Sequence, residues 1–372
     1  MRKKIAVVGA GQMGRAIAYA MDTLDYNLII LDQNQTALSS CKKLLPNKKR
    51  HTFSRFECDI FDGQVNQAAF NILKGADAVI SSLPYHKNSI LAKQCIPDGI
   101  AYFDLGGHVG TSETINDITK QTNGTCFTDL GLAPGWANIM AEEAYQEILE
   151  TPLEVKIRCG GIPESKAPES IDPFNYKPTW SVQGLYNEYV DSCEMLIDGE
   201  IKQTPSLKET EYVRITSSKL ESFTMEYLEA FTTSGGISHT LQLMKDRGVY
   251  NCSYKTLRYQ GHRDLISYFL EQRKFDAKQL GSLFKTDRRF NDVVIVDVEA
   301  ISTNDSYRKT DIVRVKDGYS AMQRATAGGL VAAIFACLED NPSINDLKRP
   351  LGYQDVPVAV FNSFLSELEI HE

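Results

Sequence analysis

The feature that most constrains this chain lies in residues 3–32. An apolar run, IAVV at residues 5–8, is followed by GAGQMG at residues 9–14 and then by residues 15–21, whose composition favours a helix. A second β-rich run at residues 28–31 ends at Asp32. Strand, glycine turn, helix, strand and a distant acid together form the fingerprint of a dinucleotide-binding βαβ unit, which is far more specific than the glycines alone.

Each glycine of this fingerprint has a separate physical task. Gly9 permits the tight turn, Gly11 lets the backbone approach a pyrophosphate, and Gly14 lets the helix pack closely on the strand. The free N–H groups at the helix start attract phosphates, and Asp32 would accept hydrogen bonds from the adenosine ribose. The alternative is a glycine turn in an ordinary α/β protein. The cofactor contacts expected from this unit are Gly9, Gly11, Gln12, Met13, Gly14 and Asp32.

The expected cofactor is NAD. A carboxylate at Asp32 repels the 2′-phosphate of NADP, and residues 33–35 contain no Arg or Lys that would attract it.

Composition narrows the class of partner. The chain has 372 residues, a formal net charge of −8 and a pI near 5.4. This charge argues against nucleic acid or an anionic membrane surface, so we expect a small-molecule substrate. The first residues enter a strand directly, without the apolar region of a signal peptide, which predicts a cytoplasmic protein. Cysteines and histidines lack metal-ligand spacing, and we predict no metal.

Repeated strand and helix patterns predict a Rossmann doubly wound parallel sheet in residues 1–150. In such sheets ligands bind beyond the carboxyl ends of the strands. The loops at 83–86, 104–108 and 129–136 should therefore face the cofactor, with Leu83, Pro84 and Gly131 as further contacts.

The pattern changes near residue 151. Residues 151–319 are predicted to form an α+β domain with a mixed sheet that binds substrate and supports oligomerisation, and residues 320–372 a helix and tail that return to the first domain. We expect strands at 155–159, 192–197, 211–214, 254–259 and 292–300, and helices at 225–229, 262–272, 276–284 and 320–338.

Several segments along the chain resemble the saccharopine dehydrogenase-like oxidoreductases and, within that family, the lysine 6-dehydrogenases. The matching segments are residues 7–14, 104–108 (DLGGH), 129–135 (DLGLAPG), 159–163, 229–236, 255–262 and 324–326. The resemblance implies NAD-dependent oxidative deamination of the lysine ε-amino group to allysine, which cyclises to piperideine-6-carboxylate. It also implies a homo-oligomer, and pairing would protect the edge of the second sheet.

Two departures separate this chain from the saccharopine enzymes. Those enzymes usually carry an Arg where this chain has Gln183, and that Arg is expected to hold a substrate carboxylate; they carry an Asp where this chain has Ala133. The absence of both the Arg and the Asp indicates a substrate with fewer carboxylates than that of the saccharopine enzymes. Glutamate-forming saccharopine dehydrogenase, another amino-acid or opine dehydrogenase, and a non-catalytic NAD-binding regulator remain alternatives.

Oxidation of an amine requires proton transfer, because lysine arrives as ammonium with a pKa of ~10.4. Asp104 and His108 lie at one predicted strand end and Asp129 at the next, so these three are the candidate catalytic residues. Alternatively, the two acids only satisfy the backbone of glycine-rich turns.

In the second domain, Arg258 offers a planar fork that matches an α-carboxylate, unless it forms a surface salt bridge. Thr233 and His262 lie in neighbouring segments, and Tyr85 follows a strand of the first domain. These four are the candidate substrate contacts.

Overall fold

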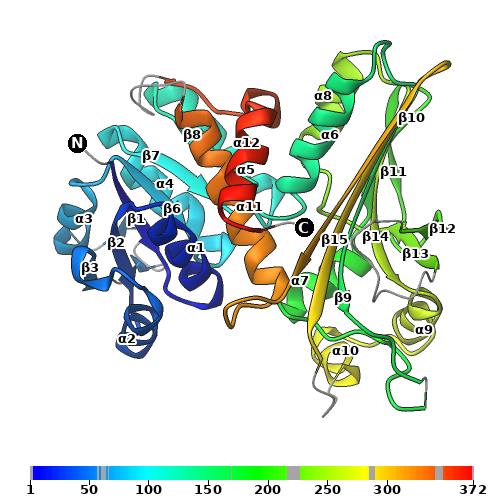
Figure 1. Cartoon of the computed structure of the whole chain (residues 1–372), viewed down its shortest axis with the longest axis horizontal. Coiled ribbons are helices and arrows are strands. Elements are labelled where there is room, and N and C mark those ends of the chain that lie inside the picture. Colours follow the sequence, from blue (N-terminus) through cyan, green and yellow to red (C-terminus); the bar gives the residue numbers. More distant parts are fainter. Residues whose placement is uncertain are drawn as a thin grey trace. The chain divides into compact units, whose positions relative to one another are not determined.

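A computed structural model describes residues 3–56, 58–59, 64–65, 67–168, 170–215, 227–284, 290–339 and 347–370. The chain divides into two compact units (Figure 1). The first contains Met1–Trp136 and Thr326–Glu369, and the second contains Ala137–Ala325 and Ile370–Glu372. The first boundary thus lies 14 residues before the expected 150, and the division near the C-terminus falls inside a helix.

The first unit alternates strands and helices. Its elements are β1 (Lys4–Val8), α1 (Gln12–Thr23), β2 (Asn27–Asp32), α2 (Gln35–Leu44), β3 (Thr52–Arg55), β4 (Cys58–Asp59), β5 (Gln64–Val65), α3 (Gln67–Leu73), β6 (Ala78–Ser81), α4 (Asn88–Cys95), β7 (Ala101–Asp104), α5 (Val109–Thr122), β8 (Cys126–Phe127) and α12 (Val358–Glu367), with short 3₁₀ turns at Lys48–Arg50, Tyr85–Lys87, Ile96–Asp98 and Tyr353–Asp355. The predicted strand, turn, helix and strand of residues 3–32 are confirmed.

A six-stranded parallel sheet forms the centre of this unit, in the order β3-β2-β1-β6-β7-β8. Because side chains alternate along a strand, Ala6 and Val8 of β1 join one apolar cluster, which includes Leu91 of α4 and Ile115 of α5. Phe335 lies in the C-terminal segment that belongs to this unit, and its ring stacks on that of Tyr26 with ring centroids 4.3 Å apart. The predicted doubly wound sheet is therefore correct, and the strand order reverses next to β1, where such sheets bind ligands.

The second unit is built on a mixed sheet. Its elements are α6 (Trp136–Glu147), β9 (Glu154–Pro163), α7 (Val182–Val190), β10 (Cys193–Ile197), β11 (Glu200–Thr204), β12 (Glu211–Arg214), β13 (Tyr227–Thr232), α8 (Thr240–Asp246), β14 (Asn251–Tyr259), α9 (His262–Ser267), a π-helical turn (Tyr268–Gln272), α10 (Ala277–Leu283), β15 (Asp292–Ile301) and β16 (Ser306–Arg314). Helix α11 (Ala321–Glu339) continues from it into the first unit.

The mixed sheet has two unlike faces. Six of its eight strands follow the order β11-β10-β14-β9-β15-β16, in which β14 and β9 are parallel. The other two strands extend the sheet from β14, because β13 pairs with both β14 and β12. Leu257 and Tyr259 of β14 lie in an apolar cluster with Val293 and Ile295 of β15. The alternate residues, Tyr254, Thr256 and Arg258, project to the other face, where α7, α9 and α10 pack (Figure 1).

One sequence-based expectation fails here. The helix predicted at 225–229 is wrong for its described part, because residues from Tyr227 onward form β13; residues 225 and 226 lie outside the described residues. Pairing with β12 on one side and β14 on the other fixes the extended backbone of this segment and overrides its local preference.

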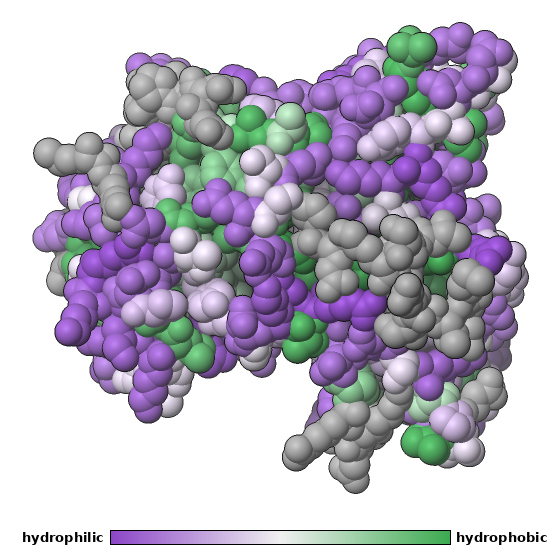
Figure 2. All heavy atoms as spheres, in the orientation of Figure 1, coloured by the Kyte–Doolittle hydropathy of each residue, from purple (hydrophilic) through white to green (hydrophobic). Residues whose placement is uncertain are grey.

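Helix α11 is long and apolar. Among the described residues, its segment Ala321–Leu338 is the one helix long and apolar enough to cross a membrane, yet 83% of that segment is buried inside the protein. Small residues such as Ala325 and Gly329 let neighbours approach, and a Cβ at Gly329 would meet the Trp136 side chain at 3.2 Å. We interpret it as a core helix. In the view of Figure 2, hydrophilic residues cover most of the visible surface.

Candidate functional site

The glycine turn between β1 and α1 has the geometry that its sequence predicts. Gly9 has a φ of +104°, and a Cβ there would lie 2.7 Å from the carbonyl oxygen of Ser82. A Cβ at Gly14 would lie 1.7 Å from the carbonyl oxygen of Gly9, so the helix can approach the turn only with glycine at this position. At Gly11, a Cβ would meet nothing within 4 Å, which leaves open space directly over the helix start.

The start of α1 suits a dinucleotide phosphate. Gly11 is its N-cap, no side chain caps the helix, and its first turn carries no acidic residue. The N–H groups there are available to an anion, and the exposed Gln12 and half-buried Met13 border the open space. The residues present therefore fit the pyrophosphate of a nicotinamide cofactor.

Asp32 closes this turn from β2. One carboxylate oxygen accepts from the backbone N–H of Ala10 at 2.6 Å and the other from that of Asn34 at 2.7 Å. A second lone pair on each oxygen is left for ribose hydroxyls. The sequence did not reveal that Arg55 of β3 lies beside it in register, where its Nε donates to the carbonyl oxygen of Gln33 at 3.1 Å.

Asp104 is buried at the end of β7 and accepts four hydrogen bonds. Its donors are the backbone N–H groups of Gly106 (2.9 Å) and Asp129 (3.2 Å), the Asn88 amide (3.1 Å) and the Tyr102 hydroxyl (3.0 Å). Burial and the nearby charge of Asp129 raise the pKa of Asp104 to about 7. These bonds tie the loop after β7 to the loop after β8, so the geometry favours the backbone role over direct contact with substrate.

Asp129 lies close to the same glycine loop. It is 7% exposed, has a φ of +62°, and accepts a 2.9 Å hydrogen bond from the Ser112 hydroxyl. A Cβ at Gly106 would lie 2.3 Å from the carboxylate of Asp129, so only glycine fits at this position of the loop. Gly131 follows in the same segment, where it is buried.

His108 is the most accessible of the three candidate catalytic residues. It caps helix α5: its Nδ1 accepts from the backbone N–H of Thr111 at 3.3 Å. Its ring stacks on Tyr85, with centroids 5.4 Å apart and an interplanar angle of 14°. Among the described residues Nε2 has no hydrogen-bond partner, so it remains available to a ligand. Leu83 and Pro84 precede this pair and are half-buried and exposed, respectively.

Arg258 of β14 lies inside the second unit. Its side chain is 3% exposed, so the surface salt bridge considered from the sequence is wrong. Nε donates to the Tyr189 hydroxyl at 3.2 Å, Nη1 donates to the carbonyl oxygen of Leu257 at 2.8 Å, and the guanidinium lies 4.3 Å from the centre of the Tyr176 ring. All three partners are neutral. The charge has no carboxylate in ion-pair contact among the described residues, which is costly for a buried cation unless a ligand anion completes the site.

His262 and Thr233 are likewise buried in the second unit. Nε2 of His262 lies 3.0 Å from the Tyr189 hydroxyl, and Nδ1 lies 3.0 Å from the carbonyl oxygen of Phe174. Burial and the charge of Arg258 lower the pKa of His262 to about 3, so the ring is neutral. Thr233 shares a 2.7 Å hydrogen bond with Thr256 and is 2% exposed. Both predicted contacts thus already have partners within the protein.

The sequence analysis missed Glu188, which lies on α7. Burial raises the pKa of this carboxyl to about 8, against the opposing effect of the Arg258 charge. No local motif marks it, since a single Glu in a short polar helix usually faces solvent.

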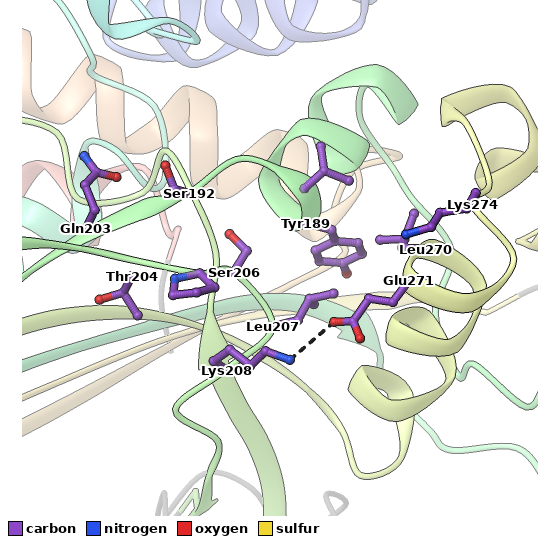
Figure 3. A pocket seen from close by; sticks show the side chains of 12 residues that line it. Tyr189, Ser192, Gln203, Thr204, Ser206, Leu207, Lys208, Leu270, Glu271 and Lys274 are labelled. Atoms are coloured by element: carbon purple, nitrogen blue, oxygen red, sulfur yellow. Dashed lines mark hydrogen bonds and ion pairs between the residues drawn. The ribbon is translucent and has the colours of Figure 1, made fainter.

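A hollow of about 500 Å³ in the second unit has Tyr189 in its lining (Figure 3). Its lining includes Ser206, Lys208, Glu271 and Lys274, and Lys208 pairs with Glu271 at 3.3 Å. None of the predicted site residues lines this hollow. Among the described residues searched, no cluster of His, Cys, Asp or Glu could hold a metal ion.

Comparison with known proteins yields matches along nearly the whole chain. The saccharopine dehydrogenase NADP binding domain family matches residues 5–127, and the saccharopine dehydrogenase C-terminal domain family matches residues 131–370. The mitochondrial α-aminoadipic semialdehyde synthases of Bos taurus and Mus musculus are 23% identical over 279 residues and 24% identical over 284 residues. Each match covers 73% of this chain and 28% of the relative, so the chain spans about 28% of the length of these relatives.

A solved structure has a similar fold. Apo histidine-tagged saccharopine dehydrogenase (L-Glu forming) from Saccharomyces cerevisiae superposes with a TM-score of 0.72 and 16% identity, covering 99% of this chain and 98% of that chain. At this identity the likeness concerns the fold. The names of the matched domains also indicate that the first unit binds a pyridine nucleotide.

Proposed function

We propose that this chain, which belongs to the saccharopine dehydrogenase family, oxidises the ε-amino group of L-lysine with NAD⁺. The products are allysine, NADH and ammonium, with water supplying the aldehyde oxygen. The cofactor would accept the hydride from the ε-carbon. Allysine is α-aminoadipic semialdehyde, the compound in the names of the bovine and mouse relatives, and this supports the proposal.

The observation that carries the proposal is the buried guanidinium of Arg258, which lacks a carboxylate partner among the described residues. A planar fork in a dry site binds one carboxylate strongly. Gln183, where the saccharopine enzymes usually carry a second arginine, is exposed and donates to the Asn187 side chain at 2.8 Å. One buried cation without the second arginine suits lysine, which has one carboxylate, better than saccharopine, which has three.

Within the first unit we assign proton transfer to His108. Its Nε2 is accessible, whereas all four hydrogen bonds of Asp104 come from protein groups, namely two loop N–H groups, the Asn88 amide and the Tyr102 hydroxyl. Asp104 and Asp129 then act by positioning the loops after β7 and β8. NAD is favoured over NADP because Asp32 repels a 2′-phosphate, although Arg55 lies beside it.

The test is NADH formation by the purified protein with L-lysine at mildly alkaline pH, with saccharopine and NADP⁺ in parallel. We expect one ammonium released per NADH formed with lysine. Gln183→Ala is the matched control, and its turnover should equal that of the wild type because the side chain is exposed. Turnover with saccharopine alone would favour the glutamate-forming reaction suggested by the fold likeness.

Cofactor binding without turnover of either compound would favour a non-catalytic NAD-binding regulator. Homo-oligomeric assembly, a cytoplasmic location and the lack of nucleic-acid and membrane partners stay predictions from the sequence.

A further inference from the structure

Arg258 belongs to a chain of hydrogen bonds inside the second unit. We propose that Tyr189 and His262 are positioning residues, which hold the Arg258 guanidinium so that the edge formed by Nη1 and Nη2 is left to bind the substrate carboxylate. The ligand role of Arg258 rests on the proposed function. The roles of Tyr189 and His262, and the choice of this edge, go beyond it.

The direction of each hydrogen bond in the chain follows from the chemistry of the partners. The carbonyl oxygen of Phe174 can only accept, so Nδ1 of His262, 3.0 Å away, carries a proton and donates. The guanidinium can only donate, so Nε of Arg258 donates to the Tyr189 hydroxyl at 3.2 Å. The hydroxyl in turn donates to Nε2 of His262 at 3.0 Å, which accepts when the ring is neutral. The chain therefore runs in one direction, from Arg258 to Phe174.

The surroundings of His262 keep its ring neutral and in one orientation. Burial and the charge of Arg258 lower the pKa of His262 to about 3. The rings of Phe231 on β13 and of Phe284, which follows α10, lie nearly parallel to the imidazole, with interplanar angles of 10° and 9°. A protonated ring would donate from Nε2 and take this acceptor away from the Tyr189 hydroxyl. The neutral form with the proton on Nδ1 is therefore the one that completes the chain.

The hydrogen bonds of Arg258 leave one edge of its guanidinium open. Nε is taken by Tyr189 and one Nη1 N–H by the carbonyl oxygen of Leu257 at 2.8 Å, whereas Nη2 has no partner in the described part of the chain. A guanidinium has five N–H groups, so one on Nη1 and two on Nη2 remain. A carboxylate binds a guanidinium through two parallel N–H groups. Because Nε is occupied, the Nη1–Nη2 edge is the pair that remains for it.

The open edge is held in a fixed plane. The ring centre of Tyr176 lies 4.3 Å from the guanidinium carbon of Arg258, and the Tyr176 and Tyr189 rings belong to one buried apolar cluster. Nη2 is not one of the described polar atoms that are both sealed from solvent and unpaired, so it borders space that solvent can enter. A donor edge that is already oriented loses little freedom when a ligand binds. The arrangement therefore favours one planar carboxylate that approaches in the plane of the guanidinium.

The first test is Tyr189→Phe, which removes the hydroxyl and keeps the ring. We expect KM for L-lysine to rise about tenfold with little change in kcat, because the guanidinium is no longer held for the carboxylate. Calorimetric titration with L-norleucine, in protein saturated with NADH, measures carboxylate binding without turnover, and its affinity should fall by a similar factor. Tyr186→Phe is the matched control. It removes the same atom from the same helix, and the Tyr186 hydroxyl has no hydrogen-bond partner among the described residues.

The second test concerns the direction of the chain and needs no turnover. NMR spectroscopy of protein with isotope-labelled histidine reports which ring nitrogen carries the proton, and the His262 signals are those lost in His262→Gln. We expect a proton on Nδ1 and none on Nε2 at neutral pH. Tyr189→Phe should shift the Nε2 signal because this nitrogen loses its donor, whereas Tyr186→Phe should leave it unchanged.

A proton on Nε2 of His262, or unchanged or raised L-norleucine affinity in Tyr189→Phe, would overturn the proposal. A lower melting temperature with wild-type affinity would limit Tyr189 to a structural role. Failure of the wild type to bind L-norleucine would remove the ligand role of the open edge. Failure of the proposed function gives a different result: lysine is not oxidised, yet L-norleucine binding still depends on the Tyr189 hydroxyl and His262 keeps its proton on Nδ1.

Discussion

Glu188 makes the stability of this protein depend on pH. Burial raises its pKa from 4.5 to about 8 in the folded state. The unfolded chain therefore loses this proton at lower pH than the folded chain does, and the free energy of unfolding falls as pH rises from about 4.5 to about 8, and levels off above that. The groups facing it are Arg258, Tyr176, Tyr189, Tyr254 and Cys159, of which Arg258 alone is charged in this range.

Glu188→Gln removes this dependence. We expect the variant to melt at a higher temperature than the wild type at alkaline pH, with a difference that shrinks as pH falls toward about 5. Thermal unfolding of both proteins across this range measures it. Asp104, whose pKa is raised to about 7, adds a slope of the same sign to both proteins and cancels in the difference. Parallel curves would show that the Glu188 carboxyl is ionised throughout.

Two glycines of one turn should respond in opposite ways to the same added methyl group. At Gly14 the new Cβ would meet the backbone of Gly9 at 1.7 Å, so Gly14→Ala is expected to lower the melting temperature and weaken NADH binding together. At Gly11 the Cβ meets nothing within 4 Å, so Gly11→Ala should keep its melting temperature. Its methyl group occupies space needed by the pyrophosphate, and NADH affinity should fall about tenfold or more.

Thermal unfolding and NADH fluorescence titration of the two glycine variants distinguish these effects. Gly11→Ala with wild-type NADH affinity would mean that the phosphates do not approach this turn.

At the scale of elements, helix α5 depends on His108 for its N-cap. Asn caps helices well and has no titratable proton, so His108→Asn keeps the cap, whereas His108→Ala removes it at a cost of ~1 kcal/mol in stability. If His108 moves protons, both variants lose about a hundredfold or more in kcat, while the Ala variant alone loses stability. Measured kcat and melting temperature separate the two roles. Wild-type kcat in His108→Asn would limit this residue to capping.

The elements also show what could be predicted from the sequence. The βαβ unit was predictable because three sequence signals agree there: an apolar strand, a glycine turn, and a helix that is followed by a second strand. Strand β13 was not, because its extended backbone depends on pairing with strands on both sides rather than on its own residues. In the site, strand alternation identified β14 but not which face would bury Arg258, and helix α7 gave no sign that Glu188 turns inward.

At the scale of the whole molecule, cofactor and substrate groups belong to different compact units. The glycine turn lies in the unit of Met1–Trp136, and Arg258 lies in that of Ala137–Ala325. Substitutions at sites with no shared partners usually have additive free energies. Gly11→Ala should therefore lower NADH affinity without changing L-lysine affinity in cofactor-free protein, and Arg258→Lys should do the reverse.

This independence predicts the kinetics of the double variant. If each single substitution lowers kcat/KM for lysine about tenfold, Gly11→Ala with Arg258→Lys should lower it about a hundredfold, because additive free energies multiply the losses. Steady-state rates of the four proteins, measured at the same NAD⁺ and lysine concentrations, provide the comparison. A double variant no slower than its slower parent would mean that the two sites act as one coupled unit, since removing either part would then already abolish the shared contribution.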